Sequence, residues 1–235
     1  MSNQFFKFKQ FTIFHDRCGM KVGTDGVLLG AWARVDGARR LLDVGAGSGL
    51  IAIQMAQRNP VAEVEAVEID AQAAAQAEEN AARSPWAGRI RVVCADFRTF
   101  EAGAPFDAIV SNPPYFVDAL RSPDARRRLA RHAEGLGYDL LFRRSRRLLA
   151  PGGHVSLIVP AEVEKLAADA AWEHGFRLWR RTDVYTKPGK PLRRILLEWG
   201  ADFLPCRADS LCIERAEGGY SEAYRALTRD FYLNF

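Results

Sequence analysis

The residues best suited to chemistry form a short motif in the middle of the chain, Ser111-Asn112-Pro113-Pro114-Tyr115-Phe116. Two consecutive prolines remove two backbone donors and stiffen the chain, so the neighbouring carbonyl groups point in fixed directions. The Asn112 side-chain oxygen and the Pro113 carbonyl can then accept the two N–H bonds of a planar amino group, while Tyr115 stacks on the attached ring. Two such acceptors orient a nitrogen that is otherwise a poor nucleophile because its lone pair is delocalised. We therefore expect the catalytic residues to be Asn112, Pro113, Pro114 and Tyr115, acting in a transfer to a planar amino nitrogen.

A glycine-rich turn lies upstream of this motif, in the segment Asp43-Val44-Gly45-Ala46-Gly47-Ser48-Gly49. Its glycines permit a tight turn and let a ligand lie against bare backbone. A dinucleotide site has the spacing G-x-G-x-x-G, whereas Leu50 leaves G-x-G-x-G here. Asp43 would also place a carboxylate where a phosphate is expected, and it suits the ammonium group of a methionine better. These features favour S-adenosylmethionine over a dinucleotide as the cofactor.

Acidic residues also follow the next two expected strands. Glu68 lies 21 residues after Gly47, where an acid can bind ribose hydroxyls. Asp96 follows the third strand, where it could accept from an adenine amino group, and Phe97 could pack on the purine face. A single acid after a strand is more often a helix cap. Acids at three successive strand ends, behind a glycine turn, indicate a nucleoside-containing cofactor.

A parallel sheet would bring these residues together, and the middle of the chain alternates apolar runs with helical patterns as such a sheet requires. We expect strands at residues 40–44, 64–69, 90–94, 106–110, 154–159, 177–185 and 193–199. Helices are expected from the glycine turn to about residue 57 and at 71–83, 138–149 and 161–174. The last two strands flank a Lys187-Pro188-Gly189-Lys190-Pro191 turn and form a hairpin. The sequence thus predicts an α/β fold with a Rossmann-like, seven-stranded, mostly parallel sheet, helices on both faces and an antiparallel last strand.

The bulk composition narrows the class of protein. With 48% hydrophobic residues in a chain of 235, one full-sized domain can bury a substantial core. The four cysteines contain no CxxC pair and the histidines show no ligand spacing, so we expect neither a disulfide framework nor a metal. No run approaches the roughly 20 apolar residues of a membrane span, and no signal peptide is visible. We expect a soluble, cytoplasmic protein that does not bind a membrane and acts as a monomer.

Charge is unevenly distributed along the chain. Residues 121–147 hold nine arginines against three acids, a net charge of +6, whereas residues 41–107 hold ten acids against five arginines, a net charge of −5. A basic region beside an acidic one suggests a polyanionic partner for one face, and arginine binds phosphate bidentately. A solvated arginine-rich helix explains the same charges.

Three segments together resemble a known family, the class I methyltransferases that modify adenine N6 in bacterial tRNA(Val). They are the Asn-Pro-Pro-Tyr motif, the N-terminal block at residues 11–13 (FTI) and 16–32 (DRCGMKVGTDGVLLGAW), and the closing block at 224–233 (YRALTRDFYL). The resemblance spans the whole chain. It implies a single class I methyltransferase domain over residues 1–235, with residues 1–39 as an N-terminal extension that covers the cofactor site. It also implies tRNA as partner and the N6 of the adenine next to the anticodon, position 37, as the target.

The resemblance also implies roles for individual residues. Those expected to bind S-adenosylmethionine are Lys21, Thr24, Asp25, Asp43, Gly45, Gly47, Gly49, Glu68, Asp96, Phe97 and Asn112. Lys21 and Thr24 could bind the methionine carboxylate, although a capped helix start at Thr24 explains the latter equally well. Apart from the resemblance, the position of four arginines just beyond the motif would let them hold RNA phosphates that flank a flipped adenine: Arg126, Arg127, Arg128 and Arg131.

Other functions share part of these features. An N5-glutamine methyltransferase acting on a protein uses the same nitrogen chemistry, but typically carries an additional N-terminal domain. An rRNA guanine-N2 methyltransferase cannot be separated on physical grounds, because both targets are planar amines. A cofactor-binding RNA chaperone would not need the 112–115 motif, and the glycine spacing disfavours a nicotinamide oxidoreductase. The aromatic and lysine alternation at residues 5–11 could grip single-stranded RNA, but it fits an edge strand with one buried face better.

Overall fold

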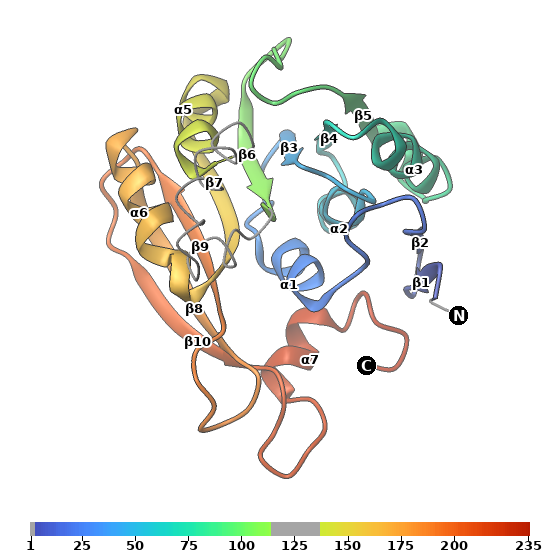
Figure 1. Cartoon of the computed structure of the whole chain (residues 1–235), viewed down its shortest axis with the longest axis vertical. Helices are drawn as coiled ribbons and strands as arrows, with labels where there is room; N and C mark the ends of the chain where they lie inside the picture. Colours follow the sequence, from blue (N-terminus) through green and yellow to red (C-terminus); the bar gives the residue numbers. More distant parts are fainter. Residues whose placement is uncertain (1–2, 114–136) are drawn as a thin grey trace, which may run out of the picture.

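The computed structural model describes residues 3–113 and 137–235, and within them an eight-stranded sheet carries helices on both faces (Figure 1). Its strands lie in the order β10-β8-β9-β7-β6-β3-β4-β5. In chain order they are β3 (Arg40–Val44), β4 (Glu63–Glu68), β5 (Ile90–Cys94), β6 (Phe106–Ser111), β7 (Leu149–Pro160), β8 (Arg177–Tyr185), β9 (Arg194–Gly200) and β10 (Arg207–Cys212). Only β9 runs antiparallel to its neighbours in this sheet. The predicted Rossmann-like α/β class is confirmed.

The central strands are apolar because helices cover both of their faces. Leu41 and Val110 belong to the cluster beneath α1 (Thr24–Trp32), α2 (Leu50–Arg58) and α7 (Glu222–Thr228). Leu42 and Ile109 belong to the cluster beneath α5 (Tyr138–Leu148) and α6 (Glu164–Glu173). Short 3-10 helices lie at Ala87–Arg89 and Ala161–Val163, and α3 (Ala71–Ala82) packs along β4 and β5. No helix in the described ranges is long and apolar enough to cross a membrane.

The sheet has one strand more than the sequence predicts. Strand β10 pairs parallel to β8 at the edge, so the antiparallel strand β9 is not the last. Residues 207–210 are all exposed, which removes the alternation of apolar and polar residues that identifies a half-buried strand. An edge strand of this kind is recognised only through its pairing.

Strand β7 begins five residues earlier than predicted and follows α5 without a loop. Pro151, Gly152 and Gly153 therefore lie inside the strand, where the β6–β7 register is irregular. A Cβ atom on Gly153 would lie 2.9 Å from the Ala150 carbonyl oxygen and 3.1 Å from that of Phe106. Gly153 is thus a site of close backbone approach inside the strand.

The N-terminal residues form a separate two-stranded antiparallel ribbon, β1 (Phe5–Lys7) and β2 (Thr12–Phe14). Phe8, Phe11 and Ile13 are buried in a cluster with Phe231 from the C-terminal segment. The prediction of a strand with buried residues is correct, but the strand pairs locally rather than at an edge of the main sheet. Phe8 and Phe11 are core residues and do not face a ligand.

Candidate active site

The strand order reverses at β3, which has β4 on one side and β6 on the other. Ligands of open α/β sheets bind beyond the carboxyl ends of the strands at such a point. Val44 of β3 pairs in register with Ser111 of β6, and the Ser111 hydroxyl donates to the Val44 carbonyl at 2.7 Å. This pairing places the glycine turn after β3 beside Asn112, although more than sixty residues of chain separate them.

A cavity of about 410 Å³ opens at this point. Its walls come from the N-terminal segment, the glycine turn with the start of α2, and Asn112. The lining residues are Met20, Lys21, Val22, Gly23, Thr24, Asp25, Gly26, Gly45, Ala46, Gly47, Ser48, Leu50, Ile51 and Asn112. Six predicted site residues thus surround one cavity: Lys21, Thr24, Asp25, Gly45, Gly47 and Asn112. The other lining residues flank these in the sequence, and that adjacency is the signal by which they could have been found.

The glycine turn is shaped to receive a ligand. Gly45 and Gly47 have φ of 72° and 53°, a region that favours glycine, and a Cβ atom on either would meet nothing within 4 Å. Gly49, with φ of 79°, precedes α2, and a Cβ atom on it would lie only 3.2 Å from the Ala77 side chain of α3. The first two glycines therefore leave open space at the cavity, while the third lets α3 approach the turn.

Asp43 lies beneath the turn, fully buried, and is not part of the cavity wall. Its Oδ2 accepts a hydrogen bond from the Ala52 N–H of α2 at 3.0 Å, and its Oδ1 has no partner among the described residues. Burial raises the pKa of this carboxyl to about 7, with a further contribution from the nearby charge of Glu68, against the opposing Ala52 bond. A buried carboxylate oxygen without a donor favours a cation close by.

Glu68 supports the turn from the end of β4. Its Oε2 accepts from the Gly47 N–H at 2.8 Å and its Oε1 from the Asp70 N–H at 2.9 Å. Each carboxylate oxygen can accept a second hydrogen bond, so both can still receive ribose hydroxyls.

Asp96 and Phe97 follow β5, further along the same edge and outside the cavity wall. A hydrogen bond from the Arg98 side chain lowers the pKa of Asp96, which keeps the carboxyl ionised. Phe97 is 5% exposed and packs in the core cluster beneath α5 and α6. Its contact with a purine stays a prediction.

Two buried amides of α3 hold the N-terminal segment at this end of the sheet. Asn80 accepts from the Phe14 N–H and donates to the carbonyl groups of Phe14 and Ser48, at 2.8–3.0 Å. Gln76 donates to Asp16 at 2.6 Å and accepts from the Arg17 N–H at 3.0 Å. Both amides are 1% exposed and lie one turn apart. The sequence interpretation missed them, although two amides on the buried face of an alanine-rich helix are the signal.

Helix α1 begins at Thr24 without a side-chain cap, so capping does not explain this threonine. Asp25, in its first turn, accepts from Arg194 Nε of β9 at 2.8 Å. The lip of the cavity is thereby tied to the β8–β9 hairpin.

Two sets of predicted residues lie outside the described ranges, Pro114 and Tyr115 of the motif and Arg126, Arg127, Arg128 and Arg131 of the basic cluster. Among residues 3–113 and 137–235, no group of three or more His, Cys, Asp or Glu side chains is arranged to hold a metal.

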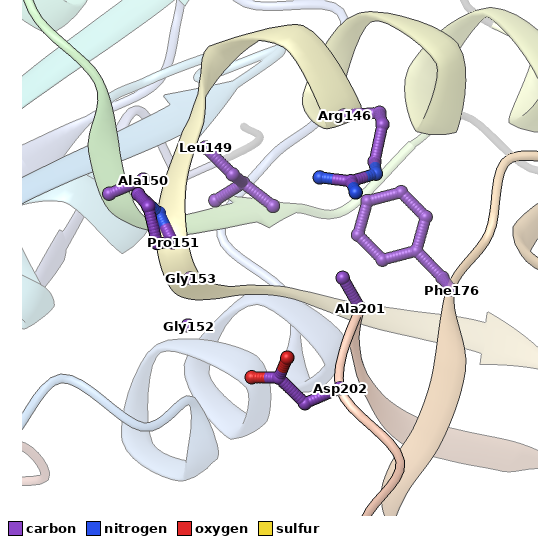
Figure 2. Close-up of a pocket in the computed structure, with 9 residues that line it drawn as sticks. All are labelled: Arg146, Leu149, Ala150, Pro151, Gly152, Gly153, Phe176, Ala201 and Asp202. Carbon is purple, nitrogen blue, oxygen red and sulfur yellow. The ribbon is translucent and has the colours of Figure 1, made fainter.

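A second cavity, of about 310 Å³, lies at the opposite end of the strands, where β7 begins. Figure 2 shows Arg146 beside the Phe176 ring, with Asp202 farther away in the same cavity. It contains none of the predicted site residues.

Comparison with known proteins agrees with this fold. The family model of the methyltransferase small domain matches residues 22–168. A Bacteroides thetaiotaomicron protein named tRNA1(Val) (adenine(37)-N6)-methyltransferase is 48% identical over 235 residues, covering 100% of this chain and 99% of that protein. A Phocaeicola vulgatus protein of the same name is 50% identical over 234 residues, covering 100% of both.

Solved structures share the fold. A predicted O-methyltransferase of Agrobacterium tumefaciens aligns with a TM-score of 0.67 at 22% identity, covering 88% of this chain and 96% of that chain. A glycopeptide N-methyltransferase complexed with S-adenosyl-L-methionine aligns with a TM-score of 0.55 at 15% identity, covering 78% and 90%. The fold and the family model define an S-adenosylmethionine-dependent methyltransferase. Within that class, the chain belongs to the family of its full-length relatives, the bacterial tRNA1(Val) (adenine(37)-N6)-methyltransferases.

Proposed function

We propose that this protein transfers a methyl group from S-adenosylmethionine to the exocyclic N6 of an adenine in tRNA, at position 37 next to the anticodon of a valine tRNA. The observation that carries the proposal is the single cavity in which the glycine turn meets Asn112. A cofactor held against the turn and a base held by Asn112 would be neighbours there.

The residues around the turn fit this cofactor. Gly45 and Gly47 would lie against it, Glu68 would accept from its ribose hydroxyls, and the buried Asp43 would attract its ammonium group. Lys21 and Thr24 would bind the methionine carboxylate from the opposite wall, and Asp96 would accept from the adenine. Bound here, S-adenosylmethionine supplies a methyl group on a positively charged sulfur. Residues 1–39 would act as a cover, because α3 holds residues 14–17 beside the turn.

The chemistry at the target nitrogen falls to the 112–115 motif. Asn112 Oδ1 and the Pro113 carbonyl would accept the two amino N–H bonds, and Tyr115 would stack on the flipped base. Both acceptors favour the arrangement in which the nitrogen lone pair faces the methyl group, so positioning supplies most of the rate enhancement. The proton leaves the methylated nitrogen after transfer.

The partner and setting follow from the same proposal. Arg126, Arg127, Arg128 and Arg131 would bind tRNA phosphates beside the flipped base. We propose that one copy of the chain suffices and that it works in the cytoplasm, where tRNA is found.

Methyl transfer from labelled S-adenosylmethionine into tRNA that lacks the modification, followed by nucleoside analysis, tests the proposal. We expect the label in N6-methyladenosine. Asn112→Ala should lower kcat at least about 100-fold, by analogy with the loss of one transition-state hydrogen bond. Asn234→Ala, at an exposed position, should retain full activity. Label in guanine N2 or in protein, with none in adenine, would reject the substrate assignment.

A further inference from the structure

The turn between β8 and β9 is a basic segment at the end of the sheet where the candidate cofactor cavity opens. Residues 186–193 contain Lys187, Lys190 and Arg193 and no acidic residue. Lys190 and Arg193 are exposed, and neither pairs with an acidic side chain in the part of the chain that the structure describes. Lys187 lies 3.4 Å from Glu214, which is itself 44% exposed. The turn therefore keeps a net positive charge.

The turn lies at the same end of the strands as Asn112. Arg194 at the start of β9 pairs in register with Pro160 at the end of β7, and β7 is the neighbour of β6. Strands lie about 4.8 Å apart, and Pro160 lies three residues beyond Leu157, the partner of Ser111, so the base of the turn is about 14 Å from the end of β6. The Arg194–Asp25 ion pair links it directly to the cavity wall. Figure 1 shows the β8–β9 turn beside the loop that precedes α7.

The backbone of this turn has a defined geometry. Lys190 N–H donates to the Lys187 carbonyl at 3.1 Å, Pro188 occupies the second position and Gly189 has φ of 75°. This is the arrangement of a type II turn, which keeps the Cα atoms of Lys187 and Lys190 within about 7 Å. The two lysines and Tyr185 line an open groove of about 640 Å³. Two cations beside an aromatic ring suit a nucleic-acid backbone with unpaired bases.

Resting on the proposed function, we infer that this turn is a tRNA docking surface, in which Lys187, Lys190 and Arg193 bind phosphates near the anticodon loop. The positive charge of the turn favours a polyanion as its binding partner. The second cavity, shown in Figure 2, carries Arg146 and Asp202 with opposite charges and has no such preference.

The test compares the triple variant Lys187→Ala, Lys190→Ala, Arg193→Ala with a control triple of equal charge, Arg39→Ala, Arg91→Ala, Arg207→Ala, whose residues are also exposed and lie outside the basic region at 121–147. Binding of the unmodified tRNA is measured across a salt titration. The turn variant should bind at least tenfold more weakly, with a slope of log K against log salt reduced by about 2, because each phosphate contact contributes about 0.7–0.9. Its affinity for S-adenosylmethionine should stay within twofold of wild type.

The double variant Lys187→Arg, Lys190→Arg should keep wild-type tRNA affinity, because the charge remains. Equal losses in the two triple variants would overturn the inference, since net charge alone would then explain them. Wild-type tRNA binding by the turn variant would overturn it as well. If the wild-type protein itself neither binds nor methylates tRNA, the proposed function fails; if it methylates tRNA and the turn variant keeps its KM, only the docking surface fails.

Discussion

At the residue scale, Asp43 and Asn112, the two residues on which the proposed function most depends, lie at different depths in the candidate site. Asp43 lies under the turn, with one oxygen fixed by α2 and the other without a partner among the described residues. Its charge acts over a short distance in a buried setting, where attraction to a cation is weakly screened. Asn112 lies on the cavity wall itself, where its carbonyl oxygen can meet a substrate.

The raised pKa of Asp43 predicts a pH-dependent cofactor affinity. Below about pH 7 the carboxyl is largely protonated, so an incoming ammonium group loses its attraction. The affinity for S-adenosylmethionine should therefore fall about threefold to tenfold between pH 8 and pH 6, the larger value applying to direct contact. Calorimetric titration of the cofactor at several pH values measures this.

Asp43→Asn provides the control for that prediction, because an amide cannot titrate. The variant should bind the cofactor weakly, with an affinity that no longer changes over this pH range. A steep pH dependence that survives in Asp43→Asn would assign it to another group.

At the scale of elements, α3 does more than cover the sheet. Its alanines allow close packing, with Ala77 in contact with Gly49, while Gln76 and Asn80 bind backbone groups of the N-terminal segment. Asn80 joins Phe14 to Ser48, so the same side chain contacts the N-terminal segment and the glycine turn. The position of one wall of the cavity thus depends on a helix that contributes no lining residue.

Asn80→Ala should therefore affect stability and cofactor binding together. The change leaves the Phe14 N–H and two carbonyl groups without their partner, which we expect to cost about 2–4 kcal/mol in the free energy of unfolding. Urea unfolding and cofactor titration measure the two effects. Glu78→Ala, exposed on the same helix, should change neither. A destabilised Asn80→Ala protein with wild-type cofactor affinity would show that the segment does not need this anchor.

At the scale of the whole molecule, the two ends of the strands differ in the polar residues that are buried there. At the end where the candidate cofactor cavity opens, Asp43 is buried below the cavity. At the opposite end, His154 and Glu198 are buried beside Arg34. Burial, followed by the charge of Arg34, lowers the pKa of His154 to about 4. His154 is therefore neutral near pH 7, and its 3.8 Å approach to Glu198 is not an ion pair.

The lowered pKa of His154 predicts that acid destabilises the protein. Below about pH 6.5, the ordinary pKa of histidine, His154 binds a proton in the unfolded chain but not in the folded chain. The free energy of unfolding therefore falls as the pH drops toward about 4. Between pH 7 and pH 5 this group should cost about 2 kcal/mol. His154→Gln, which can still donate to the Arg34 carbonyl, should lose that much less stability over the same range in urea titrations. An unchanged loss in the variant would show that other groups carry the acid sensitivity.

Contacts between distant segments complete the molecule in a way that no local pattern indicates. Lys9 donates to the Phe235 carbonyl at 2.8 Å, and Phe8 and Phe231 share one buried cluster. Strand β10 is likewise identified by its pairing with β8 rather than by its own residues. Each of these depends on which parts of the surface meet after the sheet has formed.

The sequence by itself determined seven strands of the sheet, the glycine turn and the acids at the strand ends, because strand periodicity and glycine spacing are local properties of the chain. It also predicted the parallel order that brings Gly45 and Asn112 together. Only the tertiary structure decided that Asp43 lies beneath the cavity, that Asn80 anchors its N-terminal wall, and that Arg194 joins the basic turn to Asp25. The contacts of Asn80 with Ser48 and of Arg194 with Asp25 span 32 and 169 positions of sequence, and such partners are selected by packing in three dimensions.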